Sequence, residues 1–300
     1  MTKIRSTDSS RMDDARGRGG GSGGGFPGLG GGGLPIPGGM KTGGGLVGLL
    51  VILAVVFLPQ LLNGGGQNAV TAPIDSATDR GASGACDTEL EQIVCGVTND
   101  VQDYWSAALP VAFGTKYQDT KTRLFDQPMS TGCGAASPET GPFYCPADRL
   151  VYIDLGFMQQ IEQQLVGATS DLAEQYILAH EYGHHVQNLL GTNAEVQRAS
   201  RTDPKRANQY SVALELQADC YAGAWVGDAN RRGLLDDPDE IQEAIRAAEG
   251  VGDDRIQQKT SGRIDPERWT HGSAEQRRTW FLKGFTTRDP RQCDTFAEIR

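Results

Sequence analysis

Basic residues are scarce in this chain, and the scarcity excludes one large class of partners. The 300 residues include 28 Lys and Arg against 38 Asp and Glu, which gives a formal net charge of −10. Because no segment forms a basic stripe, we expect no nucleic-acid partner. Two motifs are also missing from the sequence. Without Gly-x-x-x-x-Gly-Lys-Ser/Thr there is no phosphate loop of that type, and without Cys-x-x-Cys a structural zinc site held by cysteines is disfavoured.

Histidine is rare as well, and its distribution is informative. The chain has 4 histidines, and His180, His184 and His185 fall in one short stretch in which residues 180–184 read H-E-x-x-H. On a helix, histidines four residues apart lie on one face, so both rings can reach one ion with Glu181 beside it. A catalytic zinc takes three protein ligands and a water, and Glu181 would be the base for that water. The alternative is a chance match, with both histidines satisfied inside an ordinary helix.

The surroundings of this motif predict a helix that Ser170 or Asp171 caps and that runs to Leu190. Asp171 and Glu174 place acid in its first turn, apolar residues recur at helical spacing, and Gly191 is a suitable stop. The helical frame favours the zinc interpretation over the chance match.

A further ligand is predicted in the next strongly apolar stretch. Residues 212–225 form a helical pattern interrupted by two acids four residues apart, Glu215 and Asp219. Burying carboxylates without partners is costly, so these two need a cation or hydrogen-bond donors. Zinc would satisfy Glu215, and the free N–H of a ligand histidine would satisfy Asp219. The alternative is that both acids face water.

These motifs resemble those of known zinc peptidases. H-E-x-x-H followed by E-x-x-A-D is similar to the gluzincin group, in which a glutamate is the third ligand. Over roughly residues 86–300 the chain resembles the bacterial "putative neutral zinc metallopeptidase" family, whose members are typically anchored in the membrane by one N-terminal span. The strings that carry this resemblance are GPFYCP (141–146), VYID (151–154), AHEYGHHVQN (179–188), LELQADC (214–220) and RRTWF (277–281).

The resemblance implies a metallopeptidase that hydrolyses proteins or peptides with one Zn2+. His180, His184 and Glu215 would hold the ion, Glu181 would act as the base, and Asp219 would orient His180. Two other functions stay open. One is a non-catalytic, membrane-anchored interaction protein that keeps zinc as a structural clamp, although such a site has no use for the Glu181 base. The other is a zinc hydrolase of a non-peptide amide, such as cell-wall material.

Two short strands are predicted before the zinc helix. Residues 143–145 and 150–153 are strand-forming stretches on either side of a Pro-Ala-Asp turn. By the resemblance, one of them lines the cleft and binds the substrate as a further strand. The alternative is an ordinary hairpin, and an edge strand could be both. The predicted fold is α+β: a helix-rich, zincin-like domain with a small sheet beside the zinc helix, preceded by one transmembrane helix.

His271 is the histidine outside the zinc helix. Several gluzincins carry a late histidine, tyrosine or arginine that donates a hydrogen bond to the oxyanion of the reaction, and His271 matches that place in chain order. Arg277 is a competing donor, and the alternative is that His271 only braces the last helix, which Ser273 is expected to cap. His185 lies about 100° round the helix from His184, so we expect it to be structural.

The N-terminal third predicts a membrane anchor. Residues 1–45 are Gly-rich with few apolar side chains, which indicates a disordered tail. Residues 46–62 (LVGLLVILAVVFLPQLL) are the long apolar run, and no charged residue occurs between Lys41 and Asp75. With the glycines before it, this uncharged stretch is long enough to span the lipid bilayer, although its strongly apolar part is at the short limit. A linker, 63–85, and the zinc domain, 86–300, would follow.

The flanking charges predict the orientation of this anchor. Lys and Arg are frequent before the run, whereas none follows it until Arg80. This asymmetry places the N-terminal tail in the cytoplasm and the zinc domain outside the cytoplasmic membrane. A cleaved signal peptide, with residues 70–72 as the small-residue site, is the alternative, but the upstream region is unusually long for one.

The chain has 6 cysteines, and an even number in a domain outside the cytoplasm suggests disulfides. Taking sequence neighbours first, we propose the pairs Cys86–Cys95, Cys133–Cys145 and Cys220–Cys293. The remaining helices are expected at residues 87–94, 99–109 and 240–249, the first two with Asx caps.

Overall fold

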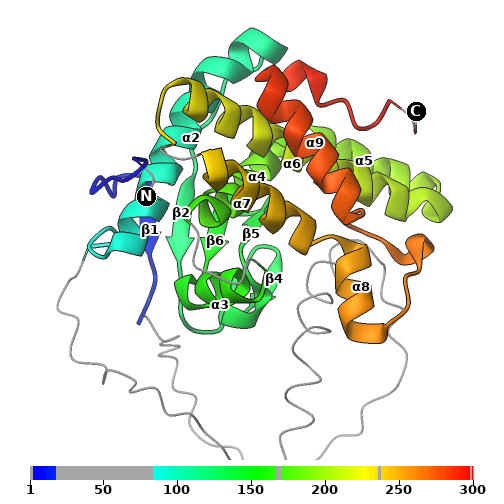
Figure 1. The fold of residues 1–300 in the computed structure, drawn as a ribbon, viewed down its shortest axis with the longest axis horizontal. Helices are drawn as coiled ribbons and strands as arrows, with labels where there is room; N and C mark the ends of the chain where they lie inside the picture. The colour runs from blue at the N-terminus through cyan, green and yellow to red at the C-terminus, as the bar shows by residue number, and fades with distance from the viewer. Residues whose placement is uncertain (1–2, 18–83, 166–170, 236–237, 298, 300) are drawn as a thin grey trace, which may run out of the picture.

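Helix α4 (Asp171–Leu190) lies at the centre of the fold, and the predicted helix and its end at Leu190 are confirmed. The computed structural model describes residues 3–17, 84–165, 171–235, 238–297 and 299. Figure 1 shows α4 between a small sheet and a set of surrounding helices. Its packing partners are α2 (Glu89–Phe113), α3 (Leu155–Leu165), α5 (Thr192–Thr202), α6 (Ala207–Arg231), α7 (Pro238–Gly250) and β5 (Phe143–Cys145).

The main sheet has four strands in the order β1-β2-β6-β5. The other three strands are β1 (Met12–Asp14), β2 (Lys121–Leu124) and β6 (Leu150–Ile153). β2 is parallel to both β1 and β6, whereas β5 and β6 form the predicted antiparallel hairpin. β3 (Met129–Thr131) and β4 (Gly134–Ala136) make a separate pair. The predicted helix-rich α+β fold with a small sheet is therefore confirmed, and its edge strand β5 packs against α4.

The two helices predicted at 87–94 and 99–109 are one continuous helix, α2. Thr88 caps it, and its hydroxyl takes part in a capping box with Glu91. The side-chain amide of Asn99 instead donates to the Asp8 carbonyl, and the side chain of Asp100 accepts from Trp225 on α6 and from Arg232 just after it. The Asx pattern that suggested a second cap therefore belongs to long-range contacts.

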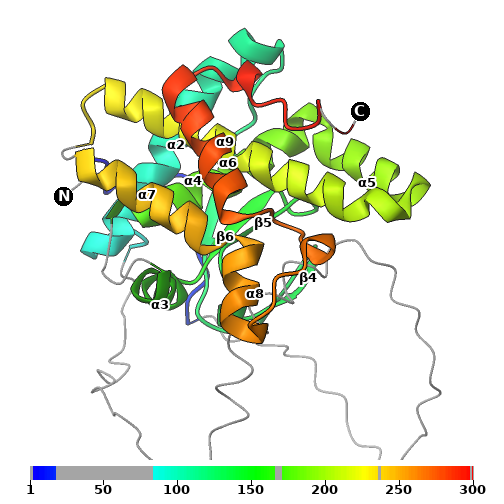
Figure 2. The ribbon, with the colours of Figure 1, turned by 45° about the vertical axis from the view of Figure 1, so that its right-hand side comes forward.

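Helices α6 and α9 (Ala274–Thr287) cross at glycine contacts, and Figures 1 and 2 both show them side by side. A Cβ at Gly223 would lie 2.1 Å from the Phe281 carbonyl oxygen, and one at Gly284 would lie 1.9 Å from that of Cys220. Only glycine permits this approach of the two backbones. Ser273 caps α9 with a capping box, as predicted. Helix α8 (Asp253–Ser261) precedes α9, and Figure 2 shows it at its N-terminal end.

The three predicted disulfides are confirmed, and each fastens a different part of the domain. Cys86–Cys95 closes the start of α2, and Cys133–Cys145 ties β5 to the turn between β3 and β4. Cys220–Cys293 joins α6 to the segment after α9.

Residues 3–17 belong to the folded domain, so the predicted disordered tail is wrong for this segment. β1 pairs with β2, and the side chains of Ile4 and Met12 are buried. Two apolar side chains are too few to predict a buried segment from sequence. Besides the local pair of Arg16 with Asp14, the acids that pair with Arg11 and Arg16 lie far along the chain, at residues 91, 103 and 119. The predicted domain boundary at residue 86 therefore leaves out β1, which is one strand of the main sheet.

The predicted anchor, 46–62, lies outside the described residues. Among the helices that the structure does describe, none has the length and apolarity needed to cross a membrane. The pairing of β1 with β2 places residues 3–17 beside the domain, whereas the predicted topology separates the two by the bilayer. A cytoplasmic tail and an external domain are therefore incompatible with the pairing of β1 and β2.

Candidate metal centre

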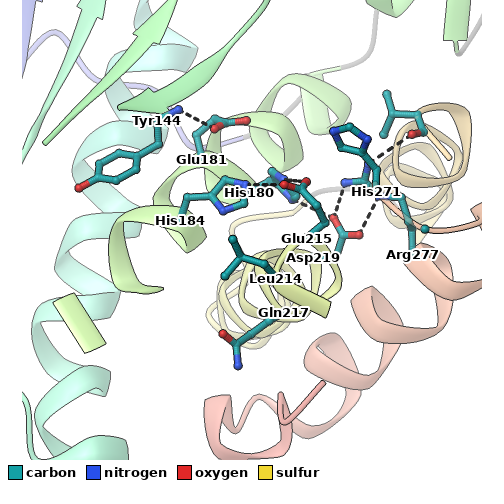
Figure 3. A network of polar contacts seen from close by, with 12 residues as sticks. Tyr144, His180, Glu181, His184, Leu214, Glu215, Gln217, Asp219, His271 and Arg277 are labelled. Atoms are coloured by element: carbon teal, nitrogen blue, oxygen red, sulfur yellow. Dashed lines mark hydrogen bonds and ion pairs between the residues drawn. The ribbon is translucent and has the colours of Figure 1, made fainter. Parts of the chain in front are cut away.

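Helix α4 presents two histidines to the same space. His180 and His184 are four residues apart, and their ring centroids are 4.7 Å apart. Figure 3 shows both rings directed toward Glu215 on α6. The His180 side chain is 9% exposed and that of His184 13%, so both are largely removed from water. The helical spacing predicted from the sequence brings these two rings together.

Helix α6 supplies the carboxylate that completes the cluster. The two Glu215 oxygens lie 3.3 Å from His180 Nε2 and 3.5 Å from His184 Nε2. Burial alone would raise the pKa of Glu215, but the two histidines and His271 outweigh burial and lower it. Glu215 is therefore an ionised carboxylate at neutral pH, and it does not face bulk water.

Each ring is fixed through its other nitrogen. His180 Nδ1 lies 2.8 Å from Asp219 Oδ1, which is the contact that the sequence predicted. His184 Nδ1 lies 2.8 Å from Gln187 Oε1, while the amide nitrogen of Gln187 donates to the Leu214 carbonyl. Both oxygens are acceptors, so both Nδ1 atoms donate and both Nε2 atoms are left to face Glu215.

Asp219 is completely buried and accepts several hydrogen bonds. Tyr176 donates its hydroxyl to Asp219 at 2.6 Å, and Arg277 donates Nε and Nη2 to the two carboxylate oxygens at 2.8 Å each. Burial would raise the pKa of Asp219, but Arg277 and His180 lower it. The guanidinium of Arg277 thereby binds Asp219 through two nitrogens (Figure 3), and this contact directs it toward that carboxylate.

The charge on His180 follows from these neighbours. Burial opposes its protonation, but the Asp219 and Glu215 carboxylates outweigh burial and raise the pKa of His180 to about 10. The metal-free ring therefore holds its proton at neutral pH. A cation that binds Nε2 must displace that proton, so metal binding strengthens as the pH rises.

Glu181 is oriented by the edge strand of the sheet. The backbone N–H of Tyr144 on β5 donates to Glu181 Oε2 at 2.8 Å (Figure 3). Burial raises the pKa of Glu181, and the two nearby histidines only partly offset it. A carboxylate with a raised pKa accepts a proton more readily, and this one is held beside the histidine pair.

His185 faces away from this cluster, as predicted. Its Nε2 donates to the Gln118 carbonyl at 2.7 Å, and its Nδ1 lies 3.0 Å from the Tyr144 hydroxyl. Burial lowers the pKa of His185 to about 4, so the ring is neutral at pH 7. With both nitrogens bound to protein groups, His185 is structural.

His271 lies close to the cluster on a loop held by Asp253. Oδ2 of Asp253 accepts the backbone N–H groups of residues 270–272 at 2.7, 2.7 and 3.0 Å. His271 Nδ1 is 2.9 Å from the Thr270 hydroxyl and 3.4 Å from Asp253 Oδ1, so Nε2 is its outward nitrogen. In the view of Figure 3, Glu181 and His271 lie on either side of the His180–Glu215 pair.

The donor set suits zinc. One ligand atom each from His180, His184 and Glu215 lie within 4.8 Å of one another. Ligand atoms about 2.0 Å from a tetrahedral zinc are about 3.3 Å apart, close to the two nitrogen–oxygen distances given above. The set comprises two imidazoles and one ionised carboxylate, with both imidazoles oriented from behind. These residues can therefore hold one zinc ion.

Some residues of the centre were missed in the sequence. Gln187 follows His184 by three residues on the same helix, a spacing at which side chains meet, so it could have been found. The Tyr144 backbone N–H donates to Glu181, and the Asp253 carboxylate accepts from the backbone around His271. Both contacts join segments that are distant in the chain, so no local pattern marks them.

The fold and the cluster together define a helix-rich α+β protein with a metal centre of the H-E-x-x-H type. A family model described as "putative neutral zinc metallopeptidase" matches residues 1–296. The chain belongs to this family, which implies zinc and, at a coarse level, peptide hydrolysis.

Curated relatives support the membership over most of the chain. The chain is 37% identical over 294 residues to "Uncharacterized protein YpfJ" of Escherichia coli K12, covering 97% of each protein. It is 46% identical over 214 residues to "Uncharacterized protein Rv2575" of Mycobacterium tuberculosis H37Rv, covering 68% of this chain and 70% of the relative. No solved structure matches the chain.

Proposed function

We propose that the chain is a zinc-dependent peptidase that hydrolyses peptide bonds of proteins or peptides outside the cytoplasmic membrane. The observation that carries the proposal is the oriented Glu181 carboxylate beside the His180, His184 and Glu215 cluster. A zinc ion that serves only as a structural clamp needs the three ligands, but it gains nothing from an additional buried base.

Three residues would bind the zinc ion, and a fourth orients one of them. His180 and His184 bind through Nε2, and Glu215 binds through its carboxylate. Asp219 holds the His180 ring in the required tautomer. When bound, zinc would polarise the scissile carbonyl and lower the pKa of the attacking water.

Glu181 moves the proton. One of its oxygens, Oε2, is engaged by the Tyr144 N–H, which leaves Oε1 to take a proton from the attacking water. Glu181 then passes this proton to the nitrogen of the leaving amine. Its raised pKa suits both steps, since the group must hold the proton between them.

His271 stabilises the charge that develops on the carbonyl oxygen. The Thr270 hydroxyl can donate to Nδ1, and in that tautomer Nε2 carries the proton and can donate to the oxyanion. Arg277 is committed to Asp219, which leaves His271 as the better candidate of the two.

The substrate binds along β5. β5 ends the described sheet next to α4, and its Tyr144 N–H already points toward Glu181. An extended peptide added to this edge would lie beside the base and the ligands. Substrate recognition by backbone pairing is consistent with a peptidase.

The domain works in an oxidising compartment. The six cysteines form three disulfides, and the described residues contain no free thiol. Disulfides of this kind persist outside the cytoplasm. The predicted lipid contact through residues 46–62 remains a proposal based on sequence.

The test is hydrolysis by the purified full-length chain. It should cleave members of a quenched-fluorescent peptide library or a labelled unfolded protein, lose this activity to a zinc chelator, and regain it with one equivalent of zinc. Bound zinc without cleavage of any peptide or protein would contradict the proposal and favour an interaction protein. Cleavage confined to cell-wall amides would contradict the substrate class alone.

A further inference from the structure

The N-terminal segment, residues 3–17, docks on the domain as a bound peptide would. β1 lies parallel to β2, with Met12 opposite Thr122 and Asp14 opposite Leu124. Figure 1 shows this strand, in blue, along the side of the sheet that is opposite β5. The segment thus closes the β2 edge by strand addition.

The rest of the segment is fitted to α2. Ile4 is 4% exposed, and a Cβ at Gly96 on α2 would lie 2.7 Å from its carbonyl oxygen. The backbone N–H of Ser6 donates to the Gln92 carbonyl at 3.0 Å. The missing side chain at Gly96 is what lets the segment approach the helix.

Charges of opposite sign face each other along this contact. Arg11 pairs with Asp103 of α2 at 2.7 Å and with Asp119 at 3.1 Å. Arg16 pairs with Glu91 of α2, and these two side chains are 11% and 5% exposed. Ion pairs removed from water to this degree require both partners to be present.

A fourth ion pair joins the two strands directly. Arg123 of β2 donates Nε to Asp13 of β1 at 2.9 Å, and the two residues are register partners. Strand pairing, apolar burial and several ion pairs therefore act together, which marks the contact as part of the native fold. The family model also begins at residue 1.

We infer that residues 3–17 and the metal-centre domain occupy the same compartment in the folded protein. A chain that crossed the bilayer once between residues 17 and 84 would leave β2 without its partner strand and Glu91 without Arg16. The N-terminal segment of a second copy could not replace the strand, because it too would lie on the side of the bilayer away from the domain. The apolar run 46–62 therefore does not separate the N-terminus from the domain.

The test is labelling of single added cysteines in an expressing bacterium. Ser9→Cys reports the exposed N-terminal segment, and Gln197→Cys on α5 is the matched control in the domain. In full-length protein in intact spheroplasts or protoplasts, a membrane-impermeant maleimide should label both positions equally. Label at Gln197→Cys alone, with Ser9→Cys reached only after lysis, would overturn the inference.

Two further outcomes separate this inference from the proposed function. If both positions react only after lysis, they share a compartment and the inference stands, but the external location proposed above fails. Loss of peptidase activity has no bearing on the labelling pattern, so each claim can fail without the other.

Docking itself is tested by charge reversal of the strand pair. In the purified full-length chain, Asp13→Arg and Arg123→Asp should each lower the Tm by about 2–4 °C, the shift that one lost contact causes in a domain of this size. The double variant, which restores opposite charges, should recover most of that loss. Additive losses in the double variant would show that the strands do not pair in solution, and would overturn the inference.

Discussion

At the scale of single residues, the metal centre depends on which atom of each side chain is already engaged. Asp219 and Gln187 accept hydrogen bonds from the two Nδ1–H groups, so the Nε2 atoms of both histidines face Glu215. Arg277 balances the buried charge of Asp219 and keeps that carboxylate ionised. The residues that can hold zinc are therefore oriented by neighbours that are not members of the cluster.

Removing the third ligand should cost more than disturbing a ligand's support. We expect Glu215→Ala to weaken zinc binding strongly, whereas Asp219→Asn should weaken it by about 10–100-fold, the usual loss for a group that orients a ligand. Competition with a chromogenic zinc chelator measures both affinities.

The Asp219→Asn variant needs a matched control because it leaves the Arg277 cation buried without its full partner. The double variant Asp219→Asn/Arg277→Met removes that charge as well, so a Tm close to wild type with weak zinc binding isolates the effect on His180. Unchanged zinc affinity in Glu215→Ala would assign the third ligand to another residue.

His271 should matter for turnover and not for metal binding. We expect His271→Ala to lower kcat by roughly 10²–10³-fold with zinc content intact, because one oxyanion donor contributes about that much. Steady-state kinetics and metal analysis of the same sample measure both quantities. A preserved kcat with a lower Tm would show that the residue only braces the loop that Asp253 holds.

At the scale of elements, the contact of α6 with α9 is what keeps Asp219 and Arg277 within reach of each other. Gly223 is one of the close points on α6, since a Cβ there would lie 2.1 Å from the Phe281 carbonyl oxygen. We expect Gly223→Ala to destabilise the protein by about 1–3 kcal/mol, the usual cost of overpacking. Urea unfolding measures the change.

Gly156→Ala is the matched control for that substitution. It lies near the start of α3, where a Cβ would meet its nearest neighbour at an ordinary 3.4 Å. It should be neutral or slightly stabilising because alanine restricts the unfolded chain. Equal losses from the two substitutions would mean that helix crossing is not the cause.

Elements with a strong local pattern could be predicted from the sequence, and those defined by distant partners could not. The periodicity of α4 and the turn between β5 and β6 are local, so the helix and both strands were predicted, the strands with the observed bounds. Asn99 resembles a helix cap in the sequence, but it is not one, because its side-chain amide donates to a carbonyl in the N-terminal segment. β1 was missed since its pairing with β2 depends on residues more than a hundred positions away.

The same distinction applies to the candidate site. His180, Glu181 and His184 share one helical turn, and Glu215 and Asp219 stand out because acids interrupt an apolar pattern. The contact of Arg277 with Asp219 could not be predicted, since only the crossing of α6 and α9 brings the two side chains together.

At the scale of the whole molecule, docking of the N-terminal segment should depend on pH. Burial would raise the pKa of Glu91, but the Thr88 N–H and Arg16 lower it. A carboxylate whose pKa is lowered on folding stabilises the protein fully at pH values above its pKa in the unfolded chain, about 4.3. This contribution is lost as the pH falls through the lower pKa of the folded protein.

Glu91→Gln isolates that charge, because glutamine can still complete the capping box with Thr88. We expect the variant to melt below wild type at pH 7 and the difference in Tm to close between about pH 4 and the lower folded pKa. Thermal scans from pH 7 to pH 2.5 measure it. A difference that stays constant over this range would mean that the ionised carboxylate contributes nothing.

Zinc content and turnover, measured on the same samples of wild type and Glu181→Gln, test directly whether Glu181 is the base of a zinc centre. Glutamine keeps the shape of the side chain and can still accept the Tyr144 N–H, and position 181 is not one of the three ligands. We predict one zinc per chain in both proteins and peptide hydrolysis only in wild type. Near-normal hydrolysis by Glu181→Gln would contradict the account.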